Sequence, residues 1–218
     1  MLNIYGFPLS SPTNKVRYVA NYLEIPYKFH LINLAQGEHL KPEFLKINPY
    51  GRIPCIENDS FRLAESNAII RYLSDMQQSA LYPVELKARA IVDQWIDYGS
   101  QHVLLAAARI MFNTYFYKFA KVQQDERAIQ DGIKYLGQYL PVVNNQLSQH
   151  AYITGETITL ADFVLIAALD VAELIHLDLA IYPHISEWRT KLMHEPFYQK
   201  THESYTVTFQ KIVNAEIA

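Results

Sequence analysis

The first part of the chain alternates between strand-like and helix-like patterns of apolar residues. The apolar start Leu2–Tyr5 predicts a short strand, and the alternating segment Tyr27–Leu31 predicts a second one. Between them, apolar residues from Val16 to Leu23 recur at i, i+3, i+4 and i+7, which is the spacing of one buried helical face. Pro12 precedes this pattern and suits the first turn of a helix. The predicted order is therefore strand, helix, strand.

A hairpin and a second helix follow. Cys55–Ile56 and Phe61–Leu63 flank the turn-forming segment Asn58–Ser60, so they predict two antiparallel strands. Apolar residues from Ile69 to Met76 then return to helical spacing. We expect a small α/β layer structure with a right-handed crossover, and this order is compatible with a thioredoxin-like domain over residues 1–78.

Strand-like patterns disappear after the predicted linker Gln77–Pro83. The segment Ile91–Phe112 keeps helical spacing and predicts an unusually long helix whose end the pattern does not fix. A second long helix is predicted over Ala128–Gln149, with a kink or a break at Pro141. We therefore expect an all-helical domain, a helical bundle, over residues 85–218.

Shorter helices complete the predicted second domain. The segment Thr159–Asp162 has the Ser/Thr-x-x-acid form of a helix start, with Asp in place of the more usual Glu or Gln. Pro183 and Pro196 bracket a further helix that contains Trp188. An aromatic segment from Tyr205 onward is expected to pack over the rest of the chain.

Composition and charge narrow the class of protein. Half of the 218 residues are apolar and the formal net charge is −3, so we expect a buried core and no basic surface for nucleic acid. The single cysteine, Cys55, rules out an internal disulfide framework and fits a reducing compartment. The start of the chain lacks a basic leader pattern, and the longest apolar helical run, Val103–Ala108, is too short to span a bilayer. We expect a soluble, cytoplasmic protein.

The segment Asn48–Pro54 is the first stretch with candidate binding chemistry. Its two prolines and one glycine exclude a helix or a central strand, so the chain turns sharply before the strand at Cys55. Ile53–Pro54 is a candidate cis peptide bond. In that form the main-chain N–H and C=O of Ile53 point outward, where an extended peptide can pair with them.

Glu65 and Ser66 stand where the last predicted strand meets the start of a helix. Free N–H groups and the positive end of the helix dipole make such a junction an anion site. We expect Ser66 to cap the helix and Glu65 to supply one negative charge. Together they suit a ligand with an amino group and a carboxylate at one end, and the alternative is an ordinary serine-capped turn.

Several spaced motifs agree with one family of enzymes. The segment Gly37–Pro49, followed by Ile53–Pro54, Glu65–Ser66 and Thr159–Asp162, resembles the cytosolic glutathione transferases. The similarity covers both predicted domains and is closest to the serine-type delta, theta and phi classes and their bacterial relatives. It implies a homodimeric detoxifying enzyme that transfers glutathione to a small hydrophobic electrophile. No metal is expected, because the eight histidines show no paired-ligand spacing.

The resemblance implies a catalytic role for a serine before the first helix. A free thiol has a pKa of roughly 8.5, so a hydroxyl that donates a hydrogen bond to the sulfur favours the thiolate. Ser10 matches the family's catalytic serine and Ser11 is the second candidate, while the alternative is a pair of turn or cap serines. In this role the serine stabilises the thiolate and is not the nucleophile. The family often has arginine near the position of Asn14.

The resemblance also implies a set of glutathione-binding residues. His39 matches a histidine at the glycyl end, and Arg52 is expected to supply a positive group because Gly51 replaces a second histidine of the delta class. Ile53 pairs through its main chain with the cysteinyl part, and Asn67 stands where arginine is common. The predicted set, in which the last two hold the γ-glutamyl amine and carboxylate, is His39, Arg52, Ile53, Pro54, Glu65 and Ser66.

An apolar pocket for the electrophile is expected from the loop after the first strand and the inner face of the long helix. The candidates are Leu9, Arg109, Phe112, Asn113 and Phe116. Core or dimer packing is the alternative for each of them. The pattern identifies neither the electrophile nor the choice among conjugation, peroxidase, isomerase, dehalogenase and disulfide reductase activities.

Two further expectations concern the type of activity. Cys55 is predicted to be a small core residue and not a nucleophile. No cysteine occupies the region of Ser10, which argues against the thiol-transferase and dehydroascorbate-reductase branches of the family. The alternative to an enzyme is a non-catalytic protein-interaction module of the same fold. The presence of Ser10, Glu65 and Ser66 together favours the enzyme, because a scaffold does not need all three.

Overall fold

The computed structural model describes residues 1–217, and contacts between residues divide the chain into two units. The first unit combines Met1–Tyr82 with the segment from Glu195 onward, and the second unit is Pro83–His194. The predicted domain ranges, 1–78 and 85–218, stay a prediction, and residue 218 lies outside the described part. The contact-based units differ from those ranges in the C-terminal segment, which groups with the first unit.

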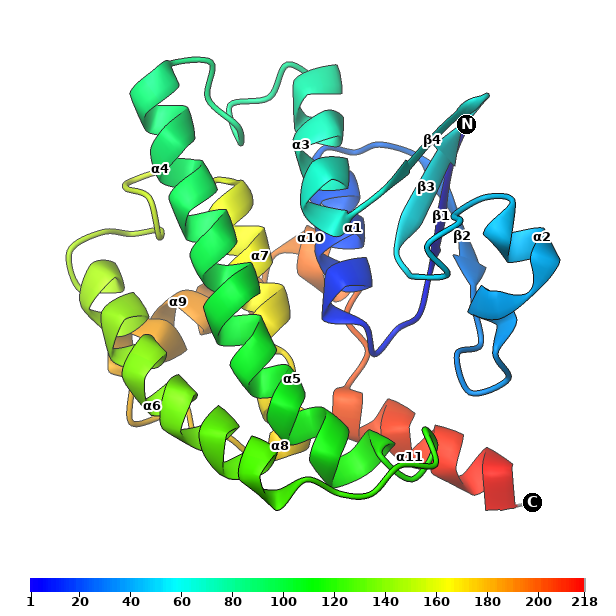
Figure 1. The fold of residues 1–218 in the computed structure, drawn as a ribbon. Helices are drawn as coiled ribbons and strands as arrows, with labels where there is room; N and C mark the ends of the chain where they lie inside the picture. Colours follow the sequence, from blue (N-terminus) through cyan, green and yellow to red (C-terminus); the bar gives the residue numbers. More distant parts are fainter. Residues whose placement is uncertain (218) are drawn as a thin grey trace. The chain divides into compact units, whose positions relative to one another are not determined.

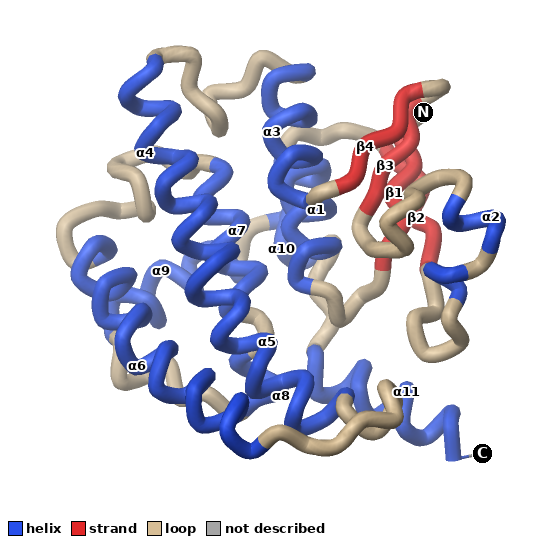
Figure 2. Tube along the Cα trace, viewed as in Figure 1, coloured by secondary structure: helices blue, strands red, loops and turns tan. Residues whose placement is uncertain are grey.

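A four-stranded sheet forms the centre of the first unit, in the order β2-β1-β3-β4 (Figure 2). Strand β1 (Leu2–Gly6) pairs in parallel with β2 (Tyr27–Leu31) and antiparallel with β3 (Cys55–Asn58). Strand β4 (Phe61–Ala64) closes the predicted hairpin by pairing antiparallel with β3. The predicted strands and the thioredoxin-like arrangement are confirmed.

Helices α1 (Ser11–Tyr22) and α3 (Ser66–Met76) lie side by side against one face of this sheet (Figure 1). Most of their predicted apolar residues are buried there with the sheet residues Ile4 and Ile56, whereas Leu23 is half-buried and Met76 is 40% exposed. Because successive strand residues point to opposite faces, Tyr5 faces the other side. The burial of two helical faces against alternating strand residues explains why the sequence pattern predicts this unit well.

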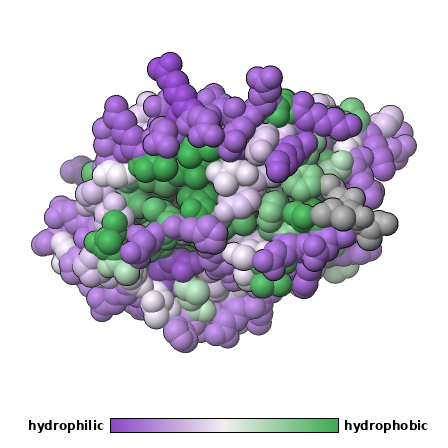
Figure 3. Space-filling view, turned by 90° about the horizontal axis from the view of Figure 1, so that it is seen from below, coloured by the Kyte–Doolittle hydropathy of each residue, from purple (hydrophilic) through white to green (hydrophobic). Residues whose placement is uncertain are grey.

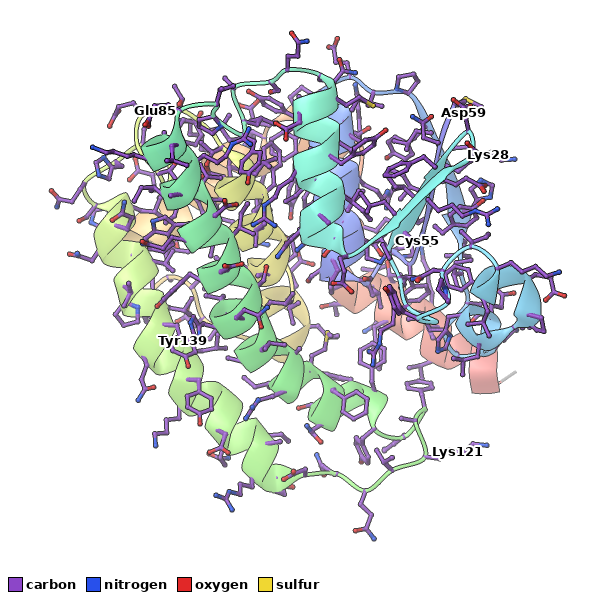
Figure 4. All side chains as sticks on the ribbon, turned by 45° about the horizontal axis from the view of Figure 1, so that its top comes forward. Lys28, Cys55, Asp59, Glu85, Lys121 and Tyr139 are labelled. Atoms are coloured by element: carbon purple, nitrogen blue, oxygen red, sulfur yellow. The ribbon has the colours of Figure 1, made fainter. Side chains whose placement is uncertain are left out.

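Short helices cover the second face of the sheet. The ring of Phe44, on α2 (Pro42–Leu45), packs edge-on against Tyr5 with 6.3 Å between ring centroids. The 3-10 helix η1 (Glu38–Leu40) precedes α2 and contacts it. Asp59 marks the tip of the β3–β4 hairpin (Figure 4), where its carboxylate lies 3.7 Å from the N-terminal amine.

The C-terminal segment of the first unit packs on α1. Helix α10 (Pro196–Gln199) places Tyr198 in a stacked arrangement on Tyr18, with ring centroids 5.2 Å apart. Asn21 Nδ2 donates to Thr201 Oγ1 at 2.6 Å. Helix α11 (Tyr205–Ile217) follows, and the predicted packing of its aromatic start is confirmed because Tyr205 is fully buried.

One long helical stretch opens the second unit, as predicted. It consists of α4 (Leu86–Asp97), the π-helical segment η2 (Tyr98–Leu104), α5 (Leu105–Met111) and a second π-helical segment η3 (Phe112–Phe116). The end that the apolar pattern left open therefore lies at Phe116. Glu85 caps the start, because its carboxylate accepts hydrogen bonds from two main-chain N–H groups of α4 (Figure 4).

Helix α6 (Glu126–Leu147) packs along α5 and contains Pro141. Of the predicted kink or break at this proline, the break is wrong, because the residues on both sides stay helical. The kink stays a prediction. Proline lacks the N–H that would bond to the carbonyl of Gly137, four residues earlier. Both residues are exposed, so water can satisfy that carbonyl and the helix continues.

Helix α7 (Leu160–Leu169) is buried on all sides, and α8 (Ala172–Ile175) and α9 (Pro183–Met193) follow it. The predicted cap of α7 is confirmed, since Asp162 Oδ2 accepts a hydrogen bond from Thr159 N at 2.9 Å. The other carboxylate oxygen accepts from Ile153 N and from Trp188 Nε1, both at 3.0 Å. Asp162 thus ties the start of α7 to α9 and to the preceding loop.

The surface and the helix lengths bear on membrane insertion. Polar residues cover most of the face shown in Figure 3, and apolar residues gather in patches between them. Among the described residues, no helix combines the length and the apolar character needed to cross a bilayer. The most apolar helix, α7, has 10 residues, whereas a spanning helix needs about 20.

Candidate functional site

Ser10 is the N-cap of α1. Its main chain is extended, and its side-chain Oγ accepts a hydrogen bond from Thr13 N at 3.2 Å. A serine hydroxyl carries one proton and two acceptor lone pairs. Because the bond to Thr13 uses the oxygen as an acceptor, the proton of Ser10 can be donated to a neighbouring group. The hydroxyl also lies at the positive end of the α1 dipole.

Side chains of α1 hold the loop that carries Ser10. Asn14 Nδ2 donates to Pro8 O at 2.7 Å, and Phe7 N donates to Thr13 Oγ1 at 3.4 Å. Gly6 allows this close approach, since a Cβ at that position would lie 2.2 Å from Thr13 Cγ2. Asn14, which stands where the family often has arginine, therefore holds the loop before Ser10 in place through its hydrogen bond to Pro8.

Ser11 is in a different environment from Ser10. It is 4% exposed, and its Oγ lies 3.3 Å from the hydroxyl of Tyr205 on α11. Asn14 Nδ2 donates to the same tyrosine hydroxyl at 3.3 Å. The hydroxyl of Ser11 is thus part of a buried network inside the first unit, whereas Ser10 is half-buried.

The start of α3 corrects one prediction. Ser66 is the first residue of the helix and not its cap, because Glu65 occupies the N-cap position. Glu65 has φ 67° and ψ 104°, a conformation that non-glycine residues rarely adopt and that costs about 1–3 kcal/mol. Its side chain makes no capping hydrogen bond and is exposed. Ile69 N makes the first intrahelical bond, to Glu65 O at 2.9 Å.

The geometry at the start of α3 favours an anion. Main-chain N–H groups of a first helical turn point out of the helix and carry its partial positive charge. No glutamate or glutamine follows at the N3 position of a capping box, since Ala68 stands there when Glu65 is the N-cap. The exposed carboxylate of Glu65 beside these donors supplies the opposite charge for an amine.

Lys15 is a residue near this helix start that the sequence analysis did not select. It lies on α1, is 2% exposed, and its Nζ donates a hydrogen bond to Asn67 Oδ1 in the first turn of α3. Burial, followed by the positive charge of Arg71, lowers the pKa of Lys15 to about 7, while Glu65 acts in the opposite direction. The signal for its burial is its spacing, because Lys15 stands four residues before the buried Val19.

The turn before β3 has the predicted form. The Ile53–Pro54 peptide bond is cis. The buried side chain of Asn48 organises the turn, since its Nδ2 donates to Arg52 O at 2.6 Å and its Oδ1 accepts from Tyr50 N at 3.2 Å. Within the described part of the chain, no residue forms a hydrogen bond with the main-chain N–H or C=O of Ile53.

The residues predicted for the glycyl end lie in the same unit. His39 is on η1, and its Nδ1 is buried without a hydrogen-bond partner among the described residues. Arg52 is exposed. A surface pocket of about 440 Å³ is lined by Ile47, Asn48, Pro49, Tyr50, Arg62, Leu63, Ala64, Glu65 and Ala68. Of the predicted glutathione residues, Glu65 alone lines this pocket.

The residues predicted for the electrophile pocket are divided between the units. Leu9 is buried in the first unit, and the other four belong to the second. Asn113 Nδ2 donates to Arg109 O at 2.9 Å, and its Oδ1 accepts from Asp125 N at 3.2 Å, so its amide joins η3 to the cap of α6. Phe112 is exposed. As an electrophile site these residues stay a prediction.

The cysteine and the possible metal-ligating side chains were the other candidates for chemistry. Cys55 lies on β3 (Figure 4), is 1% exposed, and burial raises the pKa of its thiol to about 12. The prediction of a core cysteine is therefore confirmed, because a thiol with that pKa is not ionised near neutral pH. Among the described residues, no group of three or more His, Cys, Asp or Glu side chains is placed to hold a metal ion.

Two family models match this chain. The N-terminal domain of glutathione S-transferases matches residues 4–79, and the C-terminal domain of glutathione S-transferases matches residues 104–196. The chain belongs to the glutathione S-transferase family. The thioredoxin-like first part and the helical second part match the glutathione S-transferase fold. The prediction that the protein is a glutathione S-transferase enzyme is confirmed.

Solved structures of glutathione transferases are similar over nearly the whole chain. A delta-class enzyme from Nilaparvata lugens is 29% identical, with 99% of each chain covered and a TM-score of 0.84. Glutathione transferase F7 from Populus trichocarpa is 26% identical, with 92% of this chain and 97% of that chain covered and a TM-score of 0.83. An epsilon-class enzyme from Musca domestica is 25% identical, with 99% and 98% covered and a TM-score of 0.85.

Proposed function

We propose that this glutathione S-transferase is serine-type, binding glutathione along the first unit and stabilising its thiolate through the hydroxyl of Ser10. The observation that carries the proposal is the hydrogen bond from Thr13 N to Ser10 Oγ at 3.2 Å. It occupies the oxygen as an acceptor and leaves the proton for the sulfur. Ser11 is less suited to this role, because its hydroxyl contacts Tyr205 in a buried network.

The hydroxyl and the helix act on the thiol in the same direction. A free thiol with a pKa of roughly 8.5 is only a few per cent ionised near neutral pH. A hydrogen bond donated to the sulfur, together with the positive end of α1, favours the anion. Ser10 therefore lowers the pKa of the bound thiol without becoming covalently linked to it.

The other parts of glutathione are matched to charged side chains and main-chain groups of the first unit. Glu65 pairs with the γ-glutamyl amine, and the first turn of α3 from Ser66 onward receives the carboxylate. The cysteinyl main chain pairs with the N–H and C=O of Ile53, as an added strand does. His39 and Arg52 bind the glycyl carboxylate, and Pro54 fixes the turn between them and β3.

The chemical step is a transfer of the glutathionyl group to a hydrophobic electrophile. The sulfur lone pair attacks the electrophilic carbon, a carbon–sulfur bond forms, and the leaving group departs with the bonding electron pair. The protein binds and orients both partners and supplies no covalent intermediate. We further propose a cytoplasmic homodimer, as is typical of these transferases.

Calorimetric titration with glutathione, combined with turnover of a panel of chromogenic electrophiles, tests the proposal. We expect saturable binding with one glutathione per chain and conjugation of at least one electrophile. Ser10→Ala is expected to retain binding and lose most of the turnover. Glutathione binding without turnover over a broad panel would indicate a non-catalytic module instead, and the absence of binding would contradict the proposal entirely.

A further inference from the structure

Resting on the proposed function, we infer that Lys15 is a positioning residue for the γ-glutamyl end of glutathione. Its buried amino group holds Asn67 at the start of α3 and, in the ammonium form, balances the ligand carboxylate. Lys15 does not contact the ligand in this role, because its side chain is 2% exposed and acts through Asn67.

The geometry places a cation next to the proposed carboxylate position. Lys15 is four residues after Ser11 and therefore lies on the same side of α1, one turn further along. Its Nζ donates to the side chain of Asn67, the residue that follows Ser66 in the first turn of α3. The ammonium thus adds a full charge to the partial charge of the helix terminus.

Charge balance explains why a cation is needed there. The γ-glutamyl end carries one ammonium and one carboxylate, and Glu65 supplies a counter-charge for the ammonium only. The other cation that acts on Lys15 is Arg71, whose guanidinium lies over the ring of Tyr82 at 5.9 Å from its centroid. Lys15 is a cation held at the helix start by its hydrogen bond to Asn67.

The protonation of Lys15 is sensitive to a neighbouring anion. Burial and Arg71 lower the pKa of Lys15 to about 7, and Glu65 opposes them. The ammonium form is thus partly populated near neutral pH in the absence of a ligand. An arriving carboxylate favours the ammonium, so binding takes up a proton, and affinity falls as pH rises above about 7.

The thiol of glutathione would obscure this effect, because its ionisation releases a proton on binding. S-methylglutathione has the same γ-glutamyl end and no ionisable thiol, so it is the appropriate probe. Its binding is measured by calorimetry near neutral pH in buffers of different ionisation enthalpy, which gives the number of protons taken up. We expect uptake of at most about half a proton at pH 7, rising toward one at higher pH, and an affinity that falls by at most about tenfold per pH unit.

Three variants separate Lys15 from other groups. Lys15→Arg keeps the charge at every pH and is expected to bind with less proton uptake and a flatter pH profile. Lys15→Met removes the charge, and its affinity is expected to fall severalfold and to lose the same pH dependence. Lys28→Met, on an exposed lysine of β2 (Figure 4), is the matched control and is expected to behave as wild type.

The outcomes distinguish this inference from the proposed function. If wild type does not bind S-methylglutathione, the proposed function fails. If wild type binds but its proton uptake is unchanged in Lys15→Arg and Lys15→Met, the site stands and the role of Lys15 is overturned. Circular dichroism of each variant verifies that it is folded.

Discussion

The hydroxyl of Tyr205 lies 3.3 Å from Ser11 Oγ, although 194 residues separate them in the chain. Asn14 Nδ2 donates to the same hydroxyl at 3.3 Å and to Pro8 O at 2.7 Å. The first residue of α11 therefore meets the first turn of α1 beside the loop of Ser10. This contact explains why the C-terminal segment groups with the first unit.

Tyr205→Phe is expected to destabilise the protein while keeping the packing of the ring. The change removes the hydroxyl and leaves the buried Ser11 Oγ and Asn14 amide short of a partner, which costs about 1–2 kcal/mol. Urea unfolding of the intact chain measures the free energy. Tyr50→Phe is the control, because Tyr50 is 70% exposed, and an equal effect of both changes would contradict the assigned network.

Two glycines of α6 are expected to respond oppositely to alanine. A Cβ at Gly132 would lie 2.7 Å from Ala106 O on α5, so Gly132→Ala forces the two helices apart and costs about 1–3 kcal/mol. No atom lies within 4 Å of a Cβ at Gly137, so Gly137→Ala is expected to stabilise by about 0.5–1 kcal/mol. Thermal unfolding compares the pair, and stabilisation by both substitutions would refute the close helix packing.

Asp162→Asn is expected to destabilise the second unit by more than about 2 kcal/mol. The carboxylate accepts hydrogen bonds from Thr159 N, Ile153 N and Trp188 Nε1 with its two oxygens. An asparagine side chain has an NH₂ group in place of one oxygen, so it cannot accept all three in this arrangement. Asp97→Asn, at an exposed aspartate of α4, is the control. Loss of stability no larger than that of the control would contradict the central role of this carboxylate.

The difference in stability between wild type and Asp162→Asn is expected to depend on pH. Burial raises the pKa of Asp162 from 3.8 to about 6, against the opposing hydrogen bonds. A carboxyl whose pKa is raised by folding stabilises the folded state fully below its unfolded pKa and loses that contribution as pH rises. The advantage of wild type over Asp162→Asn is therefore expected to shrink between pH 3.8 and about 6 and to stay constant above. An advantage that grows over this interval would contradict the raised pKa.

Glu65→Gly and Glu65→Gln are expected to separate backbone strain from ligand binding. At φ 67° glycine relieves a cost of about 1–3 kcal/mol and adds an entropic cost of roughly 0.5–1 kcal/mol, so Glu65→Gly should not destabilise. Glu65→Gln keeps the strain and removes the charge. Both should weaken glutathione binding by about tenfold or more, because a charged hydrogen bond is worth about 1.5–3 kcal/mol. Unchanged affinity of Glu65→Gln would remove this residue from the amine site.

Local patterns were sufficient to predict most of the fold. The strands around Ile4 and Ile56, the hairpin at Asp59 and the α7 cap at Asp162 all depend on neighbours within a few residues. Pro141 shows the limit of local rules, because exposure of the Gly137 carbonyl decides whether the helix continues.

Most of the candidate site depends on contacts that the sequence pattern does not contain. Ser66 has the chemistry of a cap, yet the backbone of Glu65 takes the N-cap position. Lys15 looks like a surface lysine until the packing of α1 against α3 buries it. The pairing of Ser11 with Tyr205 joins the two ends of the chain, and no spacing rule connects such distant residues. The resemblance to a family, and not periodicity, identified Ser10.

Titration of the thiol in bound glutathione tests the role of Ser10 most directly, by following the ultraviolet absorbance of the thiolate against pH. Wild type is expected to show a pKa below the free value of roughly 8.5. Ser10→Ala should bind glutathione and show a higher pKa, although loss of the cap costs about 1 kcal/mol of stability. Ser11→Ala should leave the pKa of the thiol unchanged. A pKa that is the same in wild type and in Ser10→Ala would contradict stabilisation of the thiolate by this hydroxyl.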